Sequence, residues 1–494
     1  MRRLRSIAIQ LGTSAAILAA ATPARAIPAF ARRYGTSCLT CHTIYPKLTP
    51  FGEAFRRNGY LFPGVDSDFV KQETVALGQE ANKKSFPGAV WPSTMPISVP
   101  LSVGFNGQLM VYPDKTATVP RANNGSQVVL DAETAEAHLF VGAAFDDTIT
   151  TFDQITFTAA GQVSVEQAQL LFNDLFGPKH FVNLVVGLGV PTIGSFGSHS
   201  SYVADQLIPN SPVTGIYGLS PDPFVLVDNY PGLELRGTFE GRLDYALGWN
   251  AGKNSWSSAF NSENWYAQAG IKIGGMRLDG EGSTGADDPL KPWAETSLTV
   301  DGFVYHSNEH FPSPTATPAN ATPASDASFT WGLGLRGMLA SAELDLGYYS
   351  QDHDRGWVNP ASASLGQVTT DVFYGELSYI VFPWLVPSLR IEDIGLRPSG
   401  ASKVSDLHII PGVAFLIRAN IKVLVVGSIE VANGFPSDAS GQPLSWAGPY
   451  PPAGTAPTGS SDWAPMLIGP RSGATVSGKA QEFESIAFML AFAM

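Results

Sequence analysis

Hydrophobic and polar residues alternate along most of the chain from Pro96 onward. The clearest example is GLELRGTFEGRLDYALGWN (232–250), where odd positions are mostly apolar or aromatic and even positions mostly polar. A period of two predicts β-strands with one apolar and one polar face. A three-residue turn around Gly241 would keep this parity on both arms, which predicts a hairpin that pairs positions 239 and 243.

The same alternation recurs in about 16 segments of about ten residues each, the first near Ile97 and the last near Glu482. This length fits a tilted membrane strand of ~9–11 residues better than an average soluble strand of ~5–6. A soluble sandwich or propeller is the alternative, since its strands also alternate. The chain shows no propeller repeat motif. We therefore predict a mostly β fold, a transmembrane outer-membrane β-barrel of about 16 strands over residues 96–494.

Aromatic residues gather at the ends of these segments, as the interfacial girdle of a membrane barrel requires. They are Trp249, Trp265 with Tyr266, Trp331 and Trp384. The chain ends on the alternating run FESIAFMLAFAM, which predicts a closing strand. With both ends of the barrel in the periplasm, the Pro-, Ser- and Gly-rich stretches 310–328 and 433–478 become extracellular loops.

The first 26 residues have the organisation of a signal peptide. A basic start precedes a mostly apolar stretch, and Ala24-Arg25-Ala26 is a cleavage signal, so we expect cleavage after Ala26. A retained N-terminal anchor is the alternative. The segment holds four of the 30 Lys and Arg residues and none of the 43 Asp and Glu, which leaves 26 against 43 and a net charge of −17. That charge argues against a nucleic-acid partner.

The only two cysteines of the chain form the motif C-x-x-C-H with Cys38, Cys41 and His42. This is the attachment motif of c-type haem, in which two thiols bond to the haem vinyl groups and the adjacent imidazole ligates the iron. A disulfide, a zinc site and a thioredoxin-like motif are the alternatives. Zinc needs further ligands at suitable spacing, and a thioredoxin-like motif needs a βαβ setting. We predict one covalent haem c on a small, helical unit over residues 27–95.

The segment TPFGEAFRRNGY (49–60) predicts a helix with Thr49 as N-cap, Pro50 in the first position and Gly59 as the stop. Over residues 27–63 five basic side chains face the single acid Glu53, a net charge of +4. These cations either neutralise haem propionates or meet an acidic partner. A plain solvated helix face is the alternative.

The second axial ligand of the haem iron is predicted from position alone. Met95 is the only methionine between the haem motif and the first strand, and a methionine ligand would raise the reduction potential. The alternatives are an open site and His138. Elsewhere HSNEH (306–310) fits the zinc-protease pattern H-x-x-E-H, but that chemistry needs a helix and the run continues a strand. Acidic pairs could attract cations into the lumen, but ordinary solvated turns are the favoured interpretation. They are Asp146-Asp147, Asp287-Asp288 and Asp352-His353-Asp354.

Residues 27–60 resemble the head of the fused monohaem cytochrome–porins. The resemblance rests on a Pro-x-Phe-Ala-Arg lead, C-x-x-C-H, and then Pro, Leu, Phe-Gly and Gly-Tyr in order. In this chain these are Pro28, Phe30, Ala31, Arg32, Cys38, Cys41, His42, Pro46, Leu48, Phe51, Gly52, Gly59 and Tyr60. The best-known members are outer-membrane iron oxidases, so the resemblance implies an oxidoreductase that passes electrons from extracellular Fe(II) to a periplasmic c-type cytochrome.

The hypothesis from the sequence is thus an electron conduit in the outer membrane of a Gram-negative bacterium: signal peptide 1–26, monohaem plug 27–95 and barrel 96–494. Two alternatives remain open. One is a porin for small solutes, with the haem unit as a sensor or lock. The other is a conduit that sends electrons outward to an external acceptor.

Overall fold

The computed structural model describes residues 29–493 with gaps at 45–46, 64–65, 72–73, 77–79, 90–93, 97–99, 112–127, 147, 159–160, 194–228, 253–262, 283–290, 292, 312–323, 359–364, 400–403, 419 and 434–483. The predicted signal segment, the pair Asp287-Asp288 and nearly all of the predicted loop 433–478 lie outside these residues.

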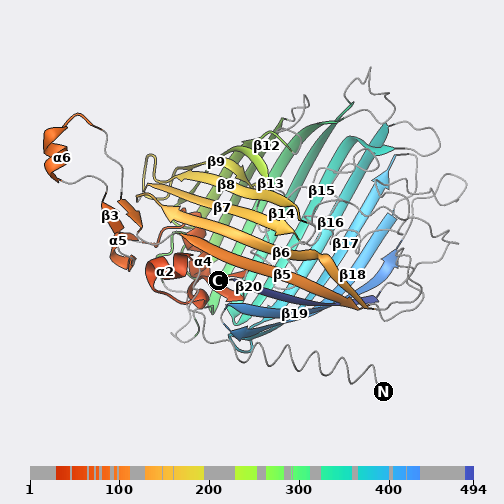
Figure 1. Ribbon diagram of the computed structural model, residues 1–494. Coiled ribbons are helices and arrows are strands. Elements are labelled where there is room, and N and C mark those ends of the chain that lie inside the picture. Colours follow the sequence, from red (N-terminus) through yellow and green to blue (C-terminus); the bar gives the residue numbers. More distant parts are fainter. Residues whose placement is uncertain are drawn as a thin grey trace, which may run out of the picture.

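Sixteen strands form one closed barrel (Figure 1). Each strand pairs antiparallel with the next in the chain, and the last strand, β20, pairs with the first, β5. The strands are β5 (Leu101–Val111), β6 (Val128–Ala144), β7 (Ile149–Thr158), β8 (Val163–Phe172), β9 (Asn183–Gly189), β10 (Tyr230–Phe239), β11 (Leu243–Asn250), β12 (Asn264–Gly274), β13 (Glu295–Phe311), β14 (Ala324–Ala340), β15 (Ala342–Val358), β16 (Leu365–Tyr379), β17 (Leu385–Pro398), β18 (Val404–Arg418), β19 (Ile421–Asn433) and β20 (Glu484–Ala493). The predicted mostly β barrel and its strand number are confirmed.

Two details of the strand prediction are wrong. The strands are 7 to 17 residues long, so several exceed the expected ten. The loop predicted at 310–328 is shorter, because β13 continues to Phe311 and β14 already begins at Ala324. Pairing between β13 and β14 extends over their whole length, so backbone hydrogen bonds hold residues whose composition is typical of a loop.

The hairpin predicted around Gly241 is confirmed. Phe239 pairs with Leu243, and the turn between them contains Glu240 and Gly241 with φ angles of 51° and 61°. The turn therefore uses the left-handed region that glycine adopts without a steric penalty. Parity is kept on both arms, as the sequence pattern required.

The two faces of the strands differ in polarity as predicted. On β11 the outward Leu247 and Trp249 are 52% and 48% exposed, whereas the inward Asp244 and Asn250 are buried. Exposed apolar or aromatic side chains occur on the other strands as well, Leu333 of β14 and Phe373 of β16 among them. A closed barrel with an apolar outer surface is stable in lipid, because every strand forms backbone hydrogen bonds with a neighbour on both sides.

Aromatic side chains mark both rims of the outer surface. Trp249 and Trp265 are paired neighbours near one rim, and Trp384 stacks on Phe382 at the other, with 5.2 Å between ring centroids. All four are exposed. Tyr266 does not belong to this girdle, contrary to the prediction, because it points inward and donates a hydrogen bond of 2.6 Å to Glu234.

Connections at one end of the barrel are short apart from 173–182 and 275–294, and those at the other end include the two longest of the barrel. Turns such as Phe145–Thr148, Glu240–Arg242 and Ser341 join strands at the first end, where the C-terminus also lies (Figure 1). The opposite ends are joined by stretches such as 190–229 and 434–483. Outer-membrane barrels keep short turns in the periplasm and long loops outside. The protein is therefore an outer-membrane barrel with its short-turn end in the periplasm.

A charge on the outer face should destabilise the barrel. Ile391 lies well inside β17 and is 40% exposed. We expect Ile391→Lys to lower the free energy of unfolding in liposomes by about 2–4 kcal/mol, because the ammonium group would face hydrocarbon. Urea titration, followed by heat-modifiable migration on gels, measures this. Ile391→Val is the control and should behave as the unchanged protein does; equal stability of the two variants would contradict a lipid-facing position.

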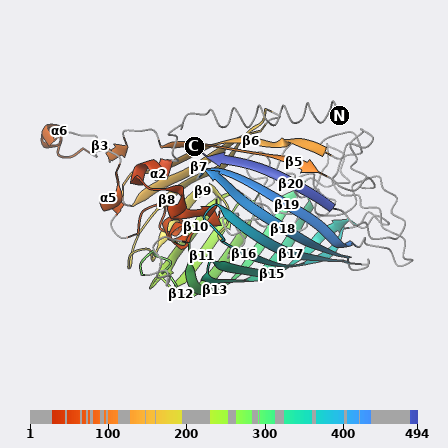
Figure 2. The same ribbon diagram turned by 90° about the horizontal axis from the view of Figure 1, so that it is seen from below.

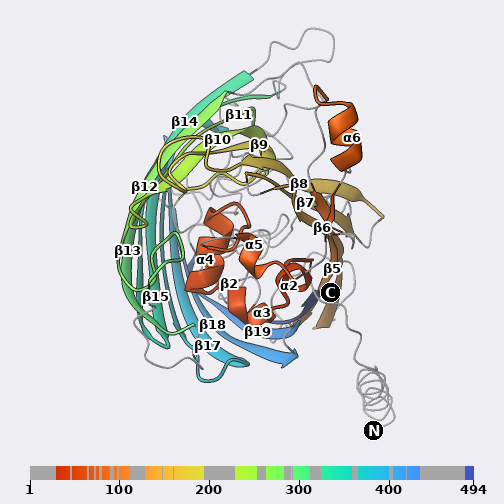
Figure 3. The ribbon, with the colours of Figure 1, turned by 90° about the vertical axis from the view of Figure 1, so that its left-hand side faces the viewer.

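The N-terminal residues form short elements at the periplasmic end. Their bounds are α2 (Ala29–Tyr34), α3 (Cys38–Cys41), β1 (His42–Ile44), β2 (Lys47–Leu48), α4 (Pro50–Arg57), α5 (Asp66–Phe69), β3 (Thr74–Ala76), α6 (Glu80–Ser85) and β4 (Thr94–Pro96). Seen along the barrel, α2, α3, α4 and β2 lie within the ring of strands (Figure 3). Among the described helices none is long and apolar enough to cross a membrane. Residues 29–63 are called the plug below.

Candidate functional site

The C-x-x-C-H motif occupies one helical turn and the residue that ends it. Ser37 caps α3 by accepting a hydrogen bond from the Leu39 amide, and the His42 amide donates to the Cys38 carbonyl. Both thiols are free and half-buried, and His42 is half-buried as well. The turn therefore holds two thiols and the imidazole on five consecutive residues.

The thiols do not have the character of a reactive dithiol. Burial raises the pKa of Cys38 and raises the pKa of Cys41 to about 12. Redox-active C-x-x-C cysteines and zinc ligands depend on thiolates, which a lowered pKa favours. Two thiols and one imidazole are the groups that a covalent haem would use, the thiols for its vinyl groups and the imidazole for its iron.

Helix α4 holds the haem-motif turn from one side. It begins as predicted, with Thr49 as N-cap and Pro50 in the first turn. The Thr49 amide donates to the Cys41 carbonyl at 2.9 Å, and its hydroxyl donates to the Thr40 carbonyl at 2.8 Å. Gly52 lies directly against the Cys41 carbonyl, with no room for a side chain. One helix start thus fixes the position of the motif.

A side chain at position 52 should lower attachment of the predicted haem. We expect Gly52→Ala to displace the turn from α4, because its Cβ would clash with the Cys41 carbonyl oxygen, at a cost of about 1–3 kcal/mol. The ratio of covalent haem to protein, measured from absorption spectra, should fall. Gly88→Ala is the control, since nothing lies within 4 Å of a Cβ there. An unchanged ratio in Gly52→Ala would show that the contact is dispensable.

Aromatic rings form the core of the plug. Phe55 of α4 contacts the rings of Phe30, Tyr34, Tyr60 and Phe62 at centroid distances of 5.2 to 6.0 Å. Such edge-to-face and stacked pairs stabilise beyond the area that they bury. Several residues of the resembled head, Phe30 and Tyr60 among them, are thus packing residues of one small core.

The core also contacts the barrel wall. Tyr60 stacks on Phe152 of β7 with 4.9 Å between centroids, and Phe30 packs against Gly142 of β6. At Gly59, where φ is +71° and the predicted helix stop is confirmed, the backbone meets Asn173 of the β8–β9 connection. The plug is therefore packed into the barrel rather than tethered beside it.

Two of the five plug cations, Lys47 and Arg57, bind acids of the barrel wall and so do not lie on a solvated helix face. Lys47 is fully buried, and its Nζ lies 2.6 Å from Glu343 and 3.3 Å from Asp345, both on β15. Arg57 lies 2.6 Å from Asp244 of β11. Ionic contacts therefore attach the plug to β11 and β15.

Other plug charges are also held locally. Glu53 lies 3.6 Å from Arg336 of β14, and Arg33 pairs with Asp66 of α5 at 2.9 Å. Arg32 donates to the carbonyl of Leu101 at the start of β5. The ion pairs leave few of these cations for an external partner.

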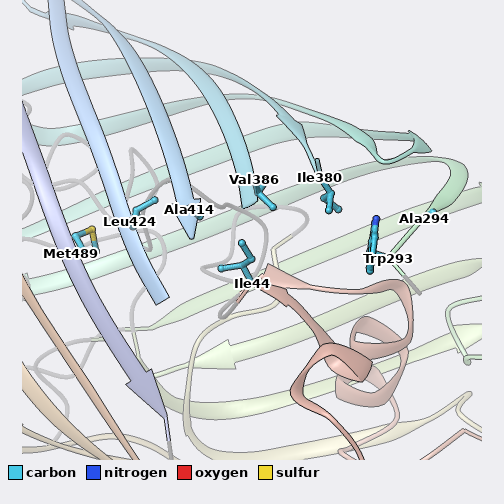
Figure 4. Packing of buried hydrophobic residues seen from close by; sticks show 8 residues of the cluster. All are labelled: Ile44, Trp293, Ala294, Ile380, Val386, Ala414, Leu424 and Met489. Atoms are coloured by element: carbon cyan, nitrogen blue, oxygen red, sulfur yellow. The ribbon is translucent and has the colours of Figure 1, made fainter. Parts of the chain in front are cut away.

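The side of the plug away from the ion pairs with β11 and β15 is held by apolar packing. Ile44 is 2% exposed and lies in one cluster with buried side chains of the barrel strands and of two connections at the same end (Figure 4). These are Trp293, Ala294, Ile380, Val386, Ala414, Leu424 and Met489. Since Val386, Ala414, Leu424 and Met489 come from β17, β18, β19 and β20, the apolar contact covers four adjacent strands. Contacts on both sides position the haem motif at the periplasmic mouth (Figures 2 and 3).

The predicted second axial ligand stays a prediction. Met95 belongs to β4, where it pairs with Val75 of β3, and its side chain lies outside the described residues. Strand β3 lies beyond α5, outside the barrel end (Figures 1 and 2). The alternative ligand His138 is engaged otherwise, because its Nε2 lies 2.5 Å from Asn106 Oδ1 and its Nδ1 2.9 Å from Thr156 Oγ1.

The other sequence patterns fall on the barrel. HSNEH lies within β13, where neighbouring positions alternate between two faces, so it lacks the helical turn of a zinc protease. Asp146 caps the β6–β7 turn by accepting from Thr148 and Ile149, which is the role of a turn residue. Asp352 and Asp354 are exposed on β15, whereas His353 between them is buried and faces the lumen.

The lumen holds a set of ion pairs that the sequence analysis did not find. Among the described residues of β10–β19, nine carboxylates and three basic side chains are buried. The carboxylates are Glu234, Asp244, Glu295, Asp301, Asp326, Glu343, Asp345, Glu376 and Glu392, and the bases are Lys272, Arg390 and Lys422. All of these carboxylates except Asp301 have a printed lysine, arginine or histidine partner, several of them Arg236, Arg336 or cations of the plug. The wall and the plug therefore neutralise most of this charge.

No family model matches the chain, and no curated protein matches it. Solved structures with a similar fold are outer-membrane barrels. The chain is similar to OmpT, an outer membrane protein of Vibrio cholerae (11% identity, TM-score 0.46), over 80% of its length and 97% of that chain. It is similar to an anion-selective porin from Comamonas acidovorans (10%, TM-score 0.48), covering 80% and 99%. It is also similar to the outer membrane channel DcaP of Acinetobacter baumannii (10%, TM-score 0.43), covering 80% and 97%.

Proposed function

We propose that the protein carries electrons across the outer membrane, from an external donor to a periplasmic cytochrome, with one covalent haem c on the plug. The observation that carries the proposal is the position of C-x-x-C-H: it lies on a plug that is packed and ion-paired inside the periplasmic mouth of a closed barrel. A haem bound there would exchange one electron at a time with partners on its two sides.

Each part of the chain has a separate task in this proposal. Cys38 and Cys41 attach the haem, and His42 ligates its iron. Lys47 and Ile44 keep the plug in the mouth. The barrel would separate this site from lipid and connect it to the long-loop end.

Ferrous iron is the first candidate for the donor, because the head of the chain resembles that of iron-oxidising cytochrome–porins. The donor would enter from outside, and the plug would present its outer surface to the acceptor in the periplasm.

Anaerobic stopped-flow spectroscopy tests the proposal. The purified protein in detergent is mixed with Fe(II), and we expect a reduced c-type α band without a mediator. If dithionite reduces the haem and Fe(II) does not, iron is the wrong donor, and an outward conduit to an external acceptor becomes the better proposal. A protein matured with haem-attachment enzymes that still shows no haem spectrum would refute the conduit altogether.

A second candidate is passage of small solutes, which the polar inner wall favours. Asn250 donates to Tyr305 and accepts from Asn264, and such hydrogen-bonding side chains line many pores. Since the plug contacts the wall on several sides, solutes could pass only around it or after its displacement. Conductance of the complete protein in a planar bilayer measures this: a large open state favours the porin, and a closed barrel favours the conduit.

A further inference from the structure

A histidine and an aspartate form a buried pair inside the barrel, far from the plug. His353 of β15 and Asp326 of β14 face the lumen, and their side chains are each 1% exposed. Nδ1 of His353 lies 2.5 Å from one carboxylate oxygen of Asp326. The other oxygen accepts a hydrogen bond of 2.7 Å from the Arg355 amide. Both oxygens of Asp326 are therefore engaged.

The second ring nitrogen of His353 has no partner. Because the carboxylate accepts from Nδ1, the proton of a neutral imidazole lies there and Nε2 carries a lone pair. This Nε2 is buried without any hydrogen bond. A carboxylate that fixes the tautomer of an imidazole, with the other nitrogen unpartnered, is the usual arrangement around a metal-ligating histidine.

Two neighbouring side chains on the same inner face are unpartnered as well. Gln351 precedes His353 by two positions, so it lies on the same face of β15, and Thr330 pairs with it across the ladder. Both are fully buried, and the Gln351 amide oxygen, its amide nitrogen and the Thr330 hydroxyl make no hydrogen bond. Leaving so many buried polar atoms unsatisfied costs about 1–3 kcal/mol each, which a bound ligand would offset.

We propose that His353, Gln351 and Thr330 form a weak site for a divalent transition-metal cation near the outer end of the lumen. An imidazole with neutral oxygen ligands and water suits iron(II), cobalt(II), nickel(II) or zinc(II). Asp326 is a positioning residue, since it fixes the imidazole and does not face the metal. Three neutral ligands bind an exchangeable ion weakly, which suits a place of transit.

The site also gives the cationic donor a place to bind as it enters the barrel, and this part of the inference rests on the proposed function. His353 is eight residues along β15 from Asp345, the partner of Lys47, or about 26 Å at ~3.3 Å per residue. The site is therefore an entry station for the cationic donor, separate from the place where the electron leaves it.

Equilibrium dialysis against Co(II), with the bound metal counted by mass spectrometry, tests the site in the complete haem-bearing protein. Cobalt is distinguished from haem iron by mass. We expect one saturable Co(II) per chain. In His353→Asn the side-chain amide can still donate to Asp326 while Nε2 is lost, and binding should weaken at least tenfold. His306→Asn is the matched control, because His306 lies on the outer face beside Trp265, and its binding should be unchanged.

A second variant distinguishes loss of a metal ligand from misfolding. Gln351→Met leaves the Asp326–His353 pair intact and should weaken Co(II) binding severalfold. If wild-type protein binds no saturable Co(II), or if His353→Asn binds it as tightly as His306→Asn does, the site holds only water and the inference is wrong. The Co(II) measurement does not involve reduction of the haem. Co(II) can therefore bind although Fe(II) is not oxidised, and Fe(II) can be oxidised although Co(II) does not bind. If both hold, His353→Asn should slow haem reduction at low Fe(II) and not at saturating Fe(II).

Discussion

Replacing Cys38 and Cys41 together by serine is expected to abolish covalent haem attachment while the barrel still folds. The two thiols are the only cysteines of the chain, so no other side chain can form the thioether bonds. The barrel should persist because its sixteen strands pair only with one another. This variant should therefore lose every redox signal and keep its membrane location, the largest effect that we expect on activity.

Haem staining after denaturing electrophoresis measures attachment, and heat-modifiable migration measures barrel folding. Leu39→Ala is the matched control, since it lies between the two cysteines and leaves C-x-x-C-H intact; it should keep its haem. A stained band in Cys38→Ser/Cys41→Ser would mean that haem is held without thioether bonds. Loss of both haem and folded barrel would instead assign the cysteines a structural role.

The barrel could be predicted from the sequence because lipid and lumen impose opposite polarities on adjacent residues. The run 232–250 shows this well: its parity alone predicted both faces of β10 and β11 and the pairing of Phe239 with Leu243. Strand ends were less predictable. The sequence around Phe311 and Ala324 contains the Pro, Ser and Thr of a loop, yet backbone pairing extends to both residues.

The site could be predicted only in part. The C-x-x-C-H motif and helix α4 depend on residues that are close together in the sequence. A short stretch of sequence is therefore enough to predict both. The partners of the plug do not: Lys47 and Asp345 are 298 residues apart, and only the closure of the barrel brings them together. The same holds for Asp326 and His353, since pairing of β14 with β15 determines which side chains face each other.

Replacing Lys47 by methionine is expected to loosen the plug. Lys47 is fully buried, and its removal would leave Glu343 and Asp345 with Arg336 as their remaining cation. Removing one partner of a buried ion pair costs about 3–5 kcal/mol of stability. Because the barrel strands pair independently of the plug, we expect this cost to fall on plug docking, and the undocked fraction should rise about 100- to 4,000-fold.

Planar-bilayer conductance measures this opening, and brief proteolysis of the plug provides a second readout. Lys83→Ala is the control, because Lys83 is 45% exposed on α6 and faces only Glu80; it should leave conductance unchanged. In Lys47→Met/Asp345→Asn the unpaired carboxylate is gone, so closure should be restored in part. Wild-type conductance in Lys47→Met would contradict an ionic seal. Equal opening in the single and double variants would show that the uncompensated charge is that of Glu343, which lies nearer to Lys47 Nζ, rather than that of Asp345.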